Sequence, residues 1–127
     1  MKFVLDTFAW IEYFNGSESG KKVDEIIESE ENEIFSSIIT IAEVASILKR
    51  NEEDVELGYK KMIDLSKLYF INSEFAKEAG ILHAEIKKNI KDFGLADAFV
   101  LLTARKLKAK IVTGDPHFKG FKEAILI

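Results

Sequence analysis

The chain has 127 residues, of which 47% are hydrophobic, and we expect it to form a single domain over residues 1–127 around one core. Its longest apolar runs fall far below the roughly 18 residues that a transmembrane helix needs, which excludes a membrane-spanning protein. The absence of cysteine excludes disulfides, thiolate nucleophiles and zinc–cysteine sites and favours a cytoplasmic location, while the net charge of −4 argues against a simple basic nucleic-acid binder.

The first predicted element is a short strand at the start of the chain. Phe3, Val4 and Leu5 form an unbroken apolar run, which is typical of a strand buried on both faces. The run ends at Asp6, so this carboxylate is expected at the carboxyl end of the strand. In an open parallel sheet that end borders the crevice where ligands bind, which makes Asp6 a candidate site residue.

Helices and short strands alternate along the rest of the chain. A helix over residues 7–14 is followed by the turn pair Asn15-Gly16, and the most apolar helix, over residues 95–107, is expected in the interior. Residues suited to helix N-caps are Ser17 or Ser19, then Ser36 or Ser37 for a helix over 38–50, and Asn51 for the next helix. Ser73 with Glu74 begins a further helix that runs to about residue 89. The remaining strands are predicted over residues 34–35, 69–71, 110–113 and 124–127.

This order of elements predicts an α/β fold with three layers, in which a mostly parallel sheet of four to five strands lies between helices. Connections in such sheets are right-handed and usually join neighbours. The chain can therefore run outward from strand 1 to strands 2 and 3 and return on the other side of strand 1, which gives the order 3-2-1-4-5. The crevice between strands 1 and 4 is then the expected site.

Four acidic residues are expected at that crevice. They are Asp6, Glu43, Asp97 and Asp115. Taken singly, Asp6 can cap the following helix and Asp115 can belong to a turn before proline. Glu43 can be a solvated helix residue, and Asp97 can complement the dipole of its own helix. Taken together, the four acids indicate a shared site.

A divalent cation would explain why these acids gather. Glu43 and Asp97 have apolar neighbours in the sequence, where a free carboxylate is costly, and clustered carboxylates repel one another. Hard oxygen ligands select Mg²⁺ or Mn²⁺, and incomplete ligation by the protein leaves positions for water and a substrate phosphate. Such a site can generate hydroxide from bound water and stabilise an in-line displacement at phosphorus.

The segments that carry these acids also resemble a known family. They are Val4-Leu5-Asp6-Thr7, Thr40-Ile41-Ala42-Glu43, Leu95-Ala96-Asp97-Ala98 with Thr103-Ala104 behind it, and Thr113-Gly114-Asp115-Pro116-His117-Phe118. In this order and spacing they make the chain similar, over essentially its whole length, to the PIN-domain family and, within it, to the VapC-like toxins of prokaryotic toxin–antitoxin pairs.

The resemblance implies a PIN-like fold and a Mg²⁺- or Mn²⁺-dependent endoribonuclease. In this chain the catalytic and metal-binding acids would be Asp6, Glu43, Asp97 and Asp115, oriented by the hydroxyls of Thr7 and Thr113. The family usually has Ser or Asn two residues after the first Asp, whereas this chain has Phe8, which removes a hydrogen bond beside the site. The implied partners are RNA, a VapB-like antitoxin and a second copy of the chain in a homodimer.

Charge and apolar patterning suggest where these partners bind. Residues 1–63 carry 7 basic and 14 acidic side chains, and residues 64–127 carry 11 basic and 8 acidic ones, so RNA should contact the second half. Candidate RNA contacts are Lys87, Lys88, Lys91 and His117. Solvated helix ends would explain the lysines equally well, and a surface turn would explain His117 better than a phosphate contact does. Candidates for an apolar antitoxin groove are Trp10, Phe14, Ile47 and Leu48.

Two other phosphate chemistries are disfavoured, while a non-enzymatic role and a different nuclease role remain as alternatives. A haloacid-dehalogenase-like phosphatase needs a second Asp where Phe8 stands, and a receiver domain needs a phospho-accepting Asp where strand 3 is followed by Asn72. A PIN fold kept as an RNA-binding or scaffolding module is expected to have lost one of the acids, and none is lost here. An RNA-processing nuclease outside a toxin–antitoxin pair would keep all four.

Overall fold

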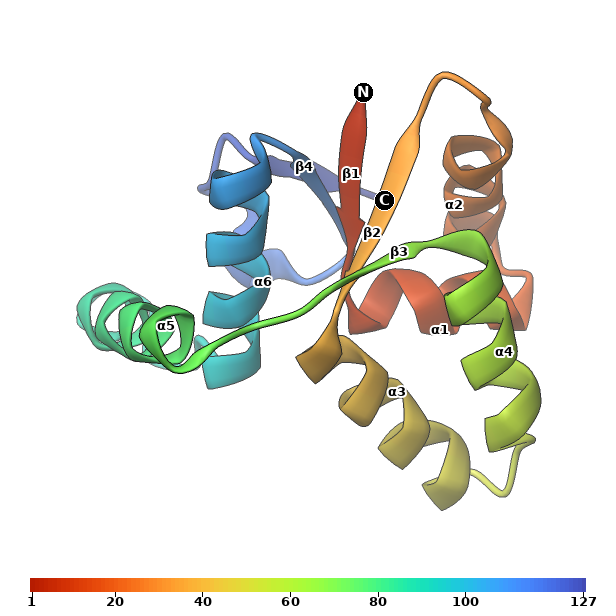
Figure 1. Ribbon diagram of the computed structural model, residues 1–127, viewed down its shortest axis with the longest axis horizontal. Coiled ribbons are helices and arrows are strands. Elements are labelled where there is room, and N and C mark those ends of the chain that lie inside the picture. Colours follow the sequence, from red (N-terminus) through yellow and green to blue (C-terminus); the bar gives the residue numbers. More distant parts are fainter.

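The computed structural model describes residues 1–127 and has a five-stranded sheet at its centre (Figure 1). All the pairings are parallel and the order is β3-β2-β1-β4-β5, so the predicted fold class and strand order are confirmed. The strands are β1 (Lys2–Leu5), β2 (Glu33–Ser37), β3 (Lys67–Tyr69), β4 (Lys110–Thr113) and β5 (Ala124–Leu126).

Two groups of helices cover the two faces of the sheet. Figure 1 shows α5 and α6 on one side, and α1, α2 and α4 on the other, with α3 below. No helix is both long enough and apolar enough to cross a membrane. The helices are α1 (Thr7–Asn15), α2 (Glu18–Glu28), α3 (Ile38–Arg50), α4 (Val55–Leu65), α5 (Ser73–Lys87) and α6 (Leu95–Leu107), with a short 3-10 helix, η1 (Pro116–Phe118), between β4 and β5.

The central strand β1 divides the core into two clusters. Phe3 and Leu5 face the cluster that includes Trp10 and Met62, while Val4 faces the cluster built around Phe93, Leu101 and Phe118. This alternation follows from the two-residue period of a strand. Both faces of β1 are therefore buried, as its unbroken apolar run predicts.

The carboxyl ends of the strands lie at one edge of the sheet, where several helices begin. In Figure 1 the chain enters β1 at the top and leaves it at the bottom, beside the starts of α1, α3 and α6. Asp6 caps α1 and Ser37 caps α3, because each has a side-chain oxygen that accepts a backbone N–H of the first turn. The edge thus collects polar side chains and free helix N–H groups.

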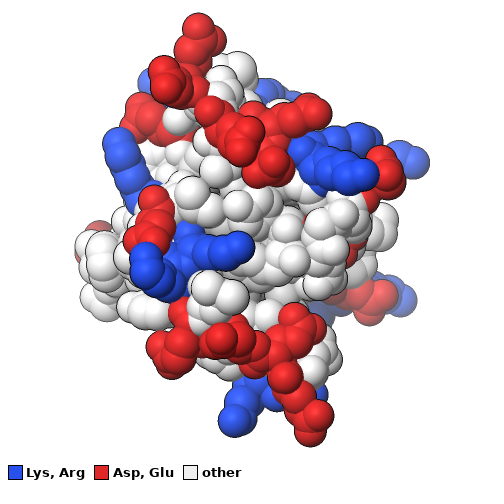
Figure 2. Space-filling model, turned by 90° about the vertical axis from the view of Figure 1, so that its right-hand side faces the viewer, with Lys and Arg blue, Asp and Glu red and all other residues white.

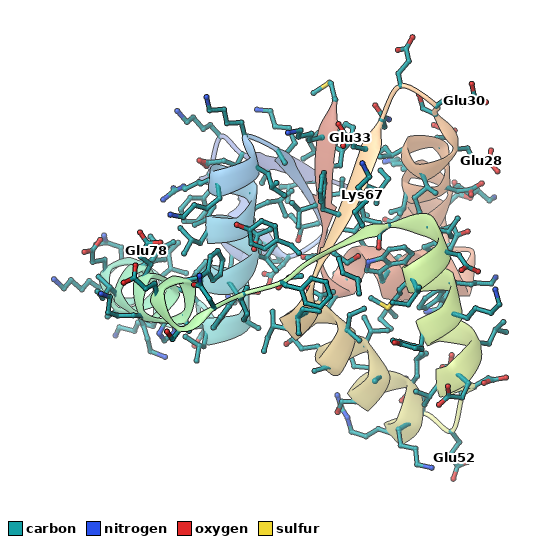
Figure 3. All side chains as sticks on the ribbon, viewed as in Figure 1. Glu28, Glu30, Glu33, Glu52, Lys67 and Glu78 are labelled. Carbon is teal, nitrogen blue, oxygen red and sulfur yellow. The ribbon has the colours of Figure 1, made fainter.

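Several boundaries predicted from the sequence differ from the structure, among them the second strand, which covers Glu33–Ser37 and not only residues 34–35. The third strand was expected over residues 69–71, but it covers Lys67–Tyr69, because its partner β2 ends at Ser37, which pairs with Tyr69. An exposed salt bridge between Lys67 Nζ and Glu33 Oε2, 3.0 Å apart, joins the amino ends of the two strands (Figure 3).

The predicted cap of the fourth helix is also misplaced. Asn51 ends α3, where its backbone N–H donates to the Ile47 carbonyl, and it does not begin α4. The N-cap of α4 is Asp54, whose Oδ1 accepts the N–H of Leu57 at 3.0 Å. Asn, Glu, Glu and Asp all suit a helix start, and the chain uses the last of the four because the preceding residues form the connecting turn.

Candidate functional site

A pocket of about 320 Å³ lies at the carboxyl edge of the sheet. Residues from α1 and its N-cap, from α3 and α6, and from the segment after β4 form its wall, and all four acids singled out in the sequence are among them. The lining consists of Asp6, Thr7, Phe8, Glu43, Asp97, Val100, Gly114, Asp115 and Pro116. The pocket occupies the switch point of the sheet, between β1 and β4.

Asp6 is the most deeply placed of these acids, with 6% of its surface exposed. Its Oδ1 accepts the backbone N–H of Ala9 at 2.9 Å, which closes the first turn of α1. Burial raises the pKa of Asp6 to about 7, against the stabilising contacts from the Thr113 side chain and the Ala9 N–H, and the charges of Asp97 and Asp115 raise it further. The fold therefore holds a carboxylate where ionisation is unfavourable.

Asp97 lies in the first turn of α6. Its Oδ2 accepts the backbone N–H of Gly94 at 2.9 Å, so the side chain reaches back to the residue that precedes the helix. Partial burial raises the pKa of Asp97, and the negative charges of Asp115 and Glu43 act in the same direction, while the Gly94 N–H and His117 oppose them. Burial and neighbouring negative charges thus raise the pKa of two acids of the pocket, Asp6 and Asp97.

Glu43 reaches the pocket from the second turn of α3 and is held by Thr7. The Thr7 Oγ1 donates to Glu43 Oε1 at 2.7 Å, which joins α1 to α3 across the mouth of the pocket. Glu43 is exposed, so the expectation that its apolar neighbours make its charge costly is wrong. Those neighbours face other directions around the helix, and Val44 alone among them is fully buried.

Asp115 and His117 belong to the turn that follows β4. Asp115 Oδ1 accepts the backbone N–H of His117 at 2.8 Å, and the Asp115 N–H donates to Thr113 Oγ1 at 2.9 Å. His117 Nδ1 lies 3.2 Å from Asp115 Oδ1. Asp97, Asp115 and His117 each offer a ligand atom, and these atoms all lie within 4.8 Å of one another. The turn therefore places an imidazole beside the acids.

These residues fit a divalent cation. Carboxylate oxygens with one imidazole nitrogen are ligands that Mg²⁺ and, more readily, Mn²⁺ accept. A cation would also relieve the repulsion that raises the pKa of Asp6 and Asp97. Asp6 and Glu43 line the same pocket but do not belong to the set of Asp97, Asp115 and His117, whose ligand atoms lie within 4.8 Å of one another. The structure therefore brings the four acids into one pocket, and two of them, Asp97 and Asp115, belong to this close set.

The lysines singled out in the sequence do not line the pocket. Lys87 is the last residue of α5, and Lys88 and Lys91 follow in the turn that leads toward α6. All three side chains are exposed. They are free to contact a polyanion outside the pocket. The same exposure is expected of lysines that are only solvated at a helix end.

Sequence analysis did not identify two residues that shape the pocket. Phe8 lines it with 39% of its surface exposed, and Gly114 lies directly against the Phe8 ring. The only sequence signal for Phe8 was its departure from the polar residue expected two positions after the first acid. No local pattern marks Gly114 as a contact of a residue more than 100 positions earlier.

A second hollow, also of about 320 Å³, lies between the ends of α1 and α3 and the start of α4. We call it the helical groove. Its lining consists of Tyr13, Phe14, Leu48, Glu53, Asp54, Leu57, Gly58 and Lys61. Figure 2 shows the side of the molecule that carries α2 and α4, with an uncharged area in the middle and acidic side chains above and below it.

Two of the four residues expected to line this groove do so, namely Phe14 and Leu48. The expectation for Trp10 is wrong, because its side chain is fully buried in the core. Its indole Nε1–H donates to Ser36 Oγ at 2.9 Å, which turns the ring toward the sheet and away from the groove. Ile47 is half-buried and does not line the groove.

The parallel sheet between helices and the acids at its switch point define the class of this chain as a three-layer α/β/α domain with an acidic site at the carboxyl edge. A sequence model described as PIN domain matches residues 3–124, so the chain belongs to the PIN domain family. The resemblance seen in the four acidic segments is thereby confirmed. A comparison with curated protein sequences finds no match.

Solved structures of similar fold cover nearly the whole chain. A toxin–antitoxin complex from Klebsiella pneumoniae is 24% identical, with a TM-score of 0.73, and the match covers 96% of this chain and 94% of that one. VapBC2 from Rickettsia felis, bound to a DNA fragment from its promoter, is 22% identical, with a TM-score of 0.68 and coverage of 100% and 98%. VapC20 from Mycobacterium tuberculosis, a Sarcin-Ricin loop cleaving toxin, is 15% identical, with a TM-score of 0.72 and coverage of 95% and 97%.

Proposed function

We propose that this PIN-domain protein is a Mg²⁺- or Mn²⁺-dependent endoribonuclease and the toxin of a VapC-like toxin–antitoxin pair. One observation carries the proposal: four acids from four segments of the chain, separated by up to 109 positions, line one pocket at the switch point of the sheet. Asp6 is kept there although burial and the neighbouring acids raise its pKa to about 7. An arrangement that is unfavourable for the protein alone is reasonable if it serves a bound cation.

In this proposal the cation is held by Asp6, Glu43, Asp97 and Asp115. When bound, it supplies positive charge that lowers the pKa of a bound water and stabilises the negative charge developing on a phosphodiester. The hydrogen bond from Thr7 fixes the orientation of Glu43, and Thr113 lies between Asp6 and the Asp115 N–H. These hydroxyls keep the acids in place while RNA binds and leaves.

The proposed antitoxin partner occupies the helical groove. The groove combines the aromatic side chains of Tyr13 and Phe14 with the carboxylates of Glu53 and Asp54, which suits a segment with both apolar and basic residues. An Arg or Lys of the same segment that reached the acidic pocket would compete with the cation. The solved relatives described as toxin–antitoxin complexes support a partner of this kind.

A homodimer in the cytoplasm completes the proposal. Phe70, just after β3, has 74% of its surface exposed, more than any other large apolar side chain. It lines a surface hollow together with Tyr69 and Phe75, and contiguous apolar surface of this kind is what contacts between proteins cover. Sedimentation analysis of the purified protein should give the mass of two chains, and a strict monomer would remove this part of the proposal without affecting the nuclease.

The nuclease is tested by incubating RNA with the purified protein and Mg²⁺, Mn²⁺ or EDTA, and with Asp6→Asn as the inactive control. Asn can still accept the Ala9 N–H, so the control keeps the cap of α1. We expect the wild-type protein to cleave RNA in the presence of Mg²⁺ or Mn²⁺, and the Asp6→Asn variant not to cleave it. Equal cleavage by the variant would remove the site, and RNA binding with no cleavage by the wild-type protein would favour an RNA-binding or scaffolding module.

The toxin assignment needs a second measurement. If a small protein encoded immediately upstream inhibits cleavage and binds this chain, the toxin–antitoxin reading is supported. Metal-dependent cleavage that no co-encoded protein inhibits would instead favour an RNA-processing nuclease outside a toxin–antitoxin pair.

A further inference from the structure

Phe8 is an apolar ring left open to solvent among charged side chains. It follows Asp6 and Thr7 at the start of α1, where the next two residues, Ala9 and Trp10, are fully buried. Its side chain lines the acidic pocket and is 39% exposed. Most of the other phenylalanines pack against aromatic partners, but Phe8 belongs to none of the ring pairs in the protein. One side of the ring is therefore available to a ligand.

The opposite side of the ring is seated on Gly114. A Cβ at position 114 would lie 2.0 Å from Phe8 Cε1 and 2.5 Å from both Cδ1 and Cζ, so no side chain fits there unless the ring moves. Gly114 lies between Thr113 and Asp115, at the end of β4. The ring thus lies across the switch point of the sheet. It is attached to α1, which follows β1, and it rests on the backbone of Gly114, which follows β4.

The pocket lining offers no lysine or arginine to a polyanion, and the one imidazole beside it, that of His117, lies against Asp115. The lining instead includes four carboxylates. A bound cation offsets part of this charge, but phosphate attraction alone leaves RNA weakly held at this point of the surface. A contact with the base would add affinity that the repelling charges do not reduce, because every base has an apolar π-face.

We infer that Phe8 is a stacking platform for one nucleobase of single-stranded RNA, adjoining the phosphodiester that faces the acids. The inference rests on the proposed nuclease function and adds how one nucleotide is held: its base, unpaired and free to leave the stack, lies on the exposed face of the Phe8 ring. Because the ring and the acids line one pocket, a nucleotide with its base on Phe8 presents its phosphate to the acids. Phe8 is thus a positioning residue, tolerant of base identity and selective against paired RNA.

The test uses short single-stranded RNA that carries 2-aminopurine at one position, whose fluorescence is quenched by stacking, and protein with Asp97→Asn so that the RNA stays intact. In this background Phe8→Leu keeps apolar bulk without a ring, and Phe8→Tyr keeps the ring. We expect Phe8→Leu to weaken RNA binding about 5- to 100-fold, the range for losing one stacked base, and to abolish quenching, while Phe8→Tyr stays within about twofold. Melting temperatures of the variants should agree, since the ring is not in the core.

Gly114→Ala supplies an independent perturbation of the same contact. The new Cβ displaces the exposed ring from its seat, so quenching should fall in this variant although Phe8 is present. Adding Phe8→Leu to Gly114→Ala should then weaken binding no further. An RNA with an abasic residue at the quenched position should lose affinity for the Asp97→Asn protein and lose none for the form that also carries Phe8→Leu.

Failure of the inference and failure of the nuclease assignment give different results. RNA binding and quenching that persist in Phe8→Leu would overturn the stacking role while wild-type cleavage stands. Ring-dependent binding without cleavage by the wild-type protein under any metal would retain the platform and overturn the nuclease. Absence of RNA binding, or an effect of Phe8→Leu on a protein partner alone, would overturn the platform.

Discussion

The acidic pocket and the helical groove have the same volume, about 320 Å³, and opposite chemistry. The groove borders favourable packing, with Trp10 and Phe14 stacked at 5.8 Å beneath it. The pocket gathers like charges and holds Asp6 in a place where burial opposes its ionisation. The packing around the helical groove stabilises the fold, whereas the burial and charge repulsion in the acidic pocket destabilise it. A destabilising arrangement that the fold retains is the stronger sign of function.

The largest effect is expected from removing one acid of the pocket. Asp97→Asn should reduce metal-dependent RNA cleavage at least about 100-fold, the scale of losing one electrostatic contact to a transition state. The Gly94 N–H retains an oxygen acceptor, so the fold should be as stable to heat as the wild type, or more so. Asp92→Asn, the same change at an exposed acid outside the pocket, is the matched control and should leave cleavage unchanged.

The cost of the pocket should appear as an unusual pH dependence of stability. The pKa of Asp6 is raised from 3.8 to about 7, so between these values the folded state binds more protons than the unfolded state. The free energy of unfolding of the metal-free protein should therefore fall as pH rises from about 4 to about 7, by on the order of 4 kcal/mol from this group. Asp97, whose pKa is also raised, adds in the same direction.

Urea unfolding at several pH values measures this slope. The Asp6→Asn variant should lack the contribution of Asp6 and exceed the wild type in stability above pH 7. A variant with the same slope as the wild type would show that Asp6 ionises without cost and would remove the contrast between the two hollows.

Divalent cations should restore the stability that the clustered acids of the pocket remove from the folded protein. A cation that binds the folded protein alone raises the free energy of unfolding by about 2.7 kcal/mol at one hundred times its Kd. Thermal unfolding in millimolar Mn²⁺ or Mg²⁺ should show this rise for the wild type and a smaller one for Asp97→Asn. An equal rise in NaCl of the same ionic strength would indicate screening instead of a bound ion.

A charge placed in the helical groove should affect binding of the partner and spare catalysis. Leu57 on α4 is 52% exposed and lines the groove, so Leu57→Glu should weaken binding of the co-encoded antitoxin at least about tenfold without altering cleavage by the free protein. Ile81→Glu on α5 changes a side chain of similar exposure, 53%, far from the groove lining. Equal losses from both variants would show that the groove is not the binding site.

The smallest effect concerns the exposed lysines. Replacing Lys87, Lys88 and Lys91 by Ala should weaken RNA binding a few-fold and flatten its salt dependence, by roughly 0.7 in slope for each lost phosphate contact. Replacing Lys21 and Lys22 on α2 should change neither. Filter binding at several salt concentrations measures both sets, and indistinguishable slopes would place the RNA elsewhere.

Sequence reasoning succeeded where local chemistry decides the outcome. An apolar run that ends at Asp6 gives a strand followed by a cap, and Ser37 before an amphipathic run gives the start of α3. The convergence of four acids follows from the strand order, because the carboxyl ends of parallel strands meet at one edge.

Sequence reasoning failed where contacts between distant segments of the chain determine the structure. The end of β3 is set by the length of β2, and the burial of Trp10 is set by Ser36, 26 positions later in the chain. Helix α1 has apolar side chains on nearly every face, so periodicity could not show which of Phe8, Trp10 and Phe14 would face the core, the pocket or the groove.

The position of β1 in the sheet also determines when the pocket forms during synthesis. β1 leaves the ribosome before its neighbour β4, and Asp6 and Asp115 are 109 positions apart. Parallel pairing over such a separation is slow and waits for the later segment. A nascent chain that has not released residue 115 therefore carries Asp6 and Glu43 without an assembled pocket, and the acids come together only when the sheet closes around β1.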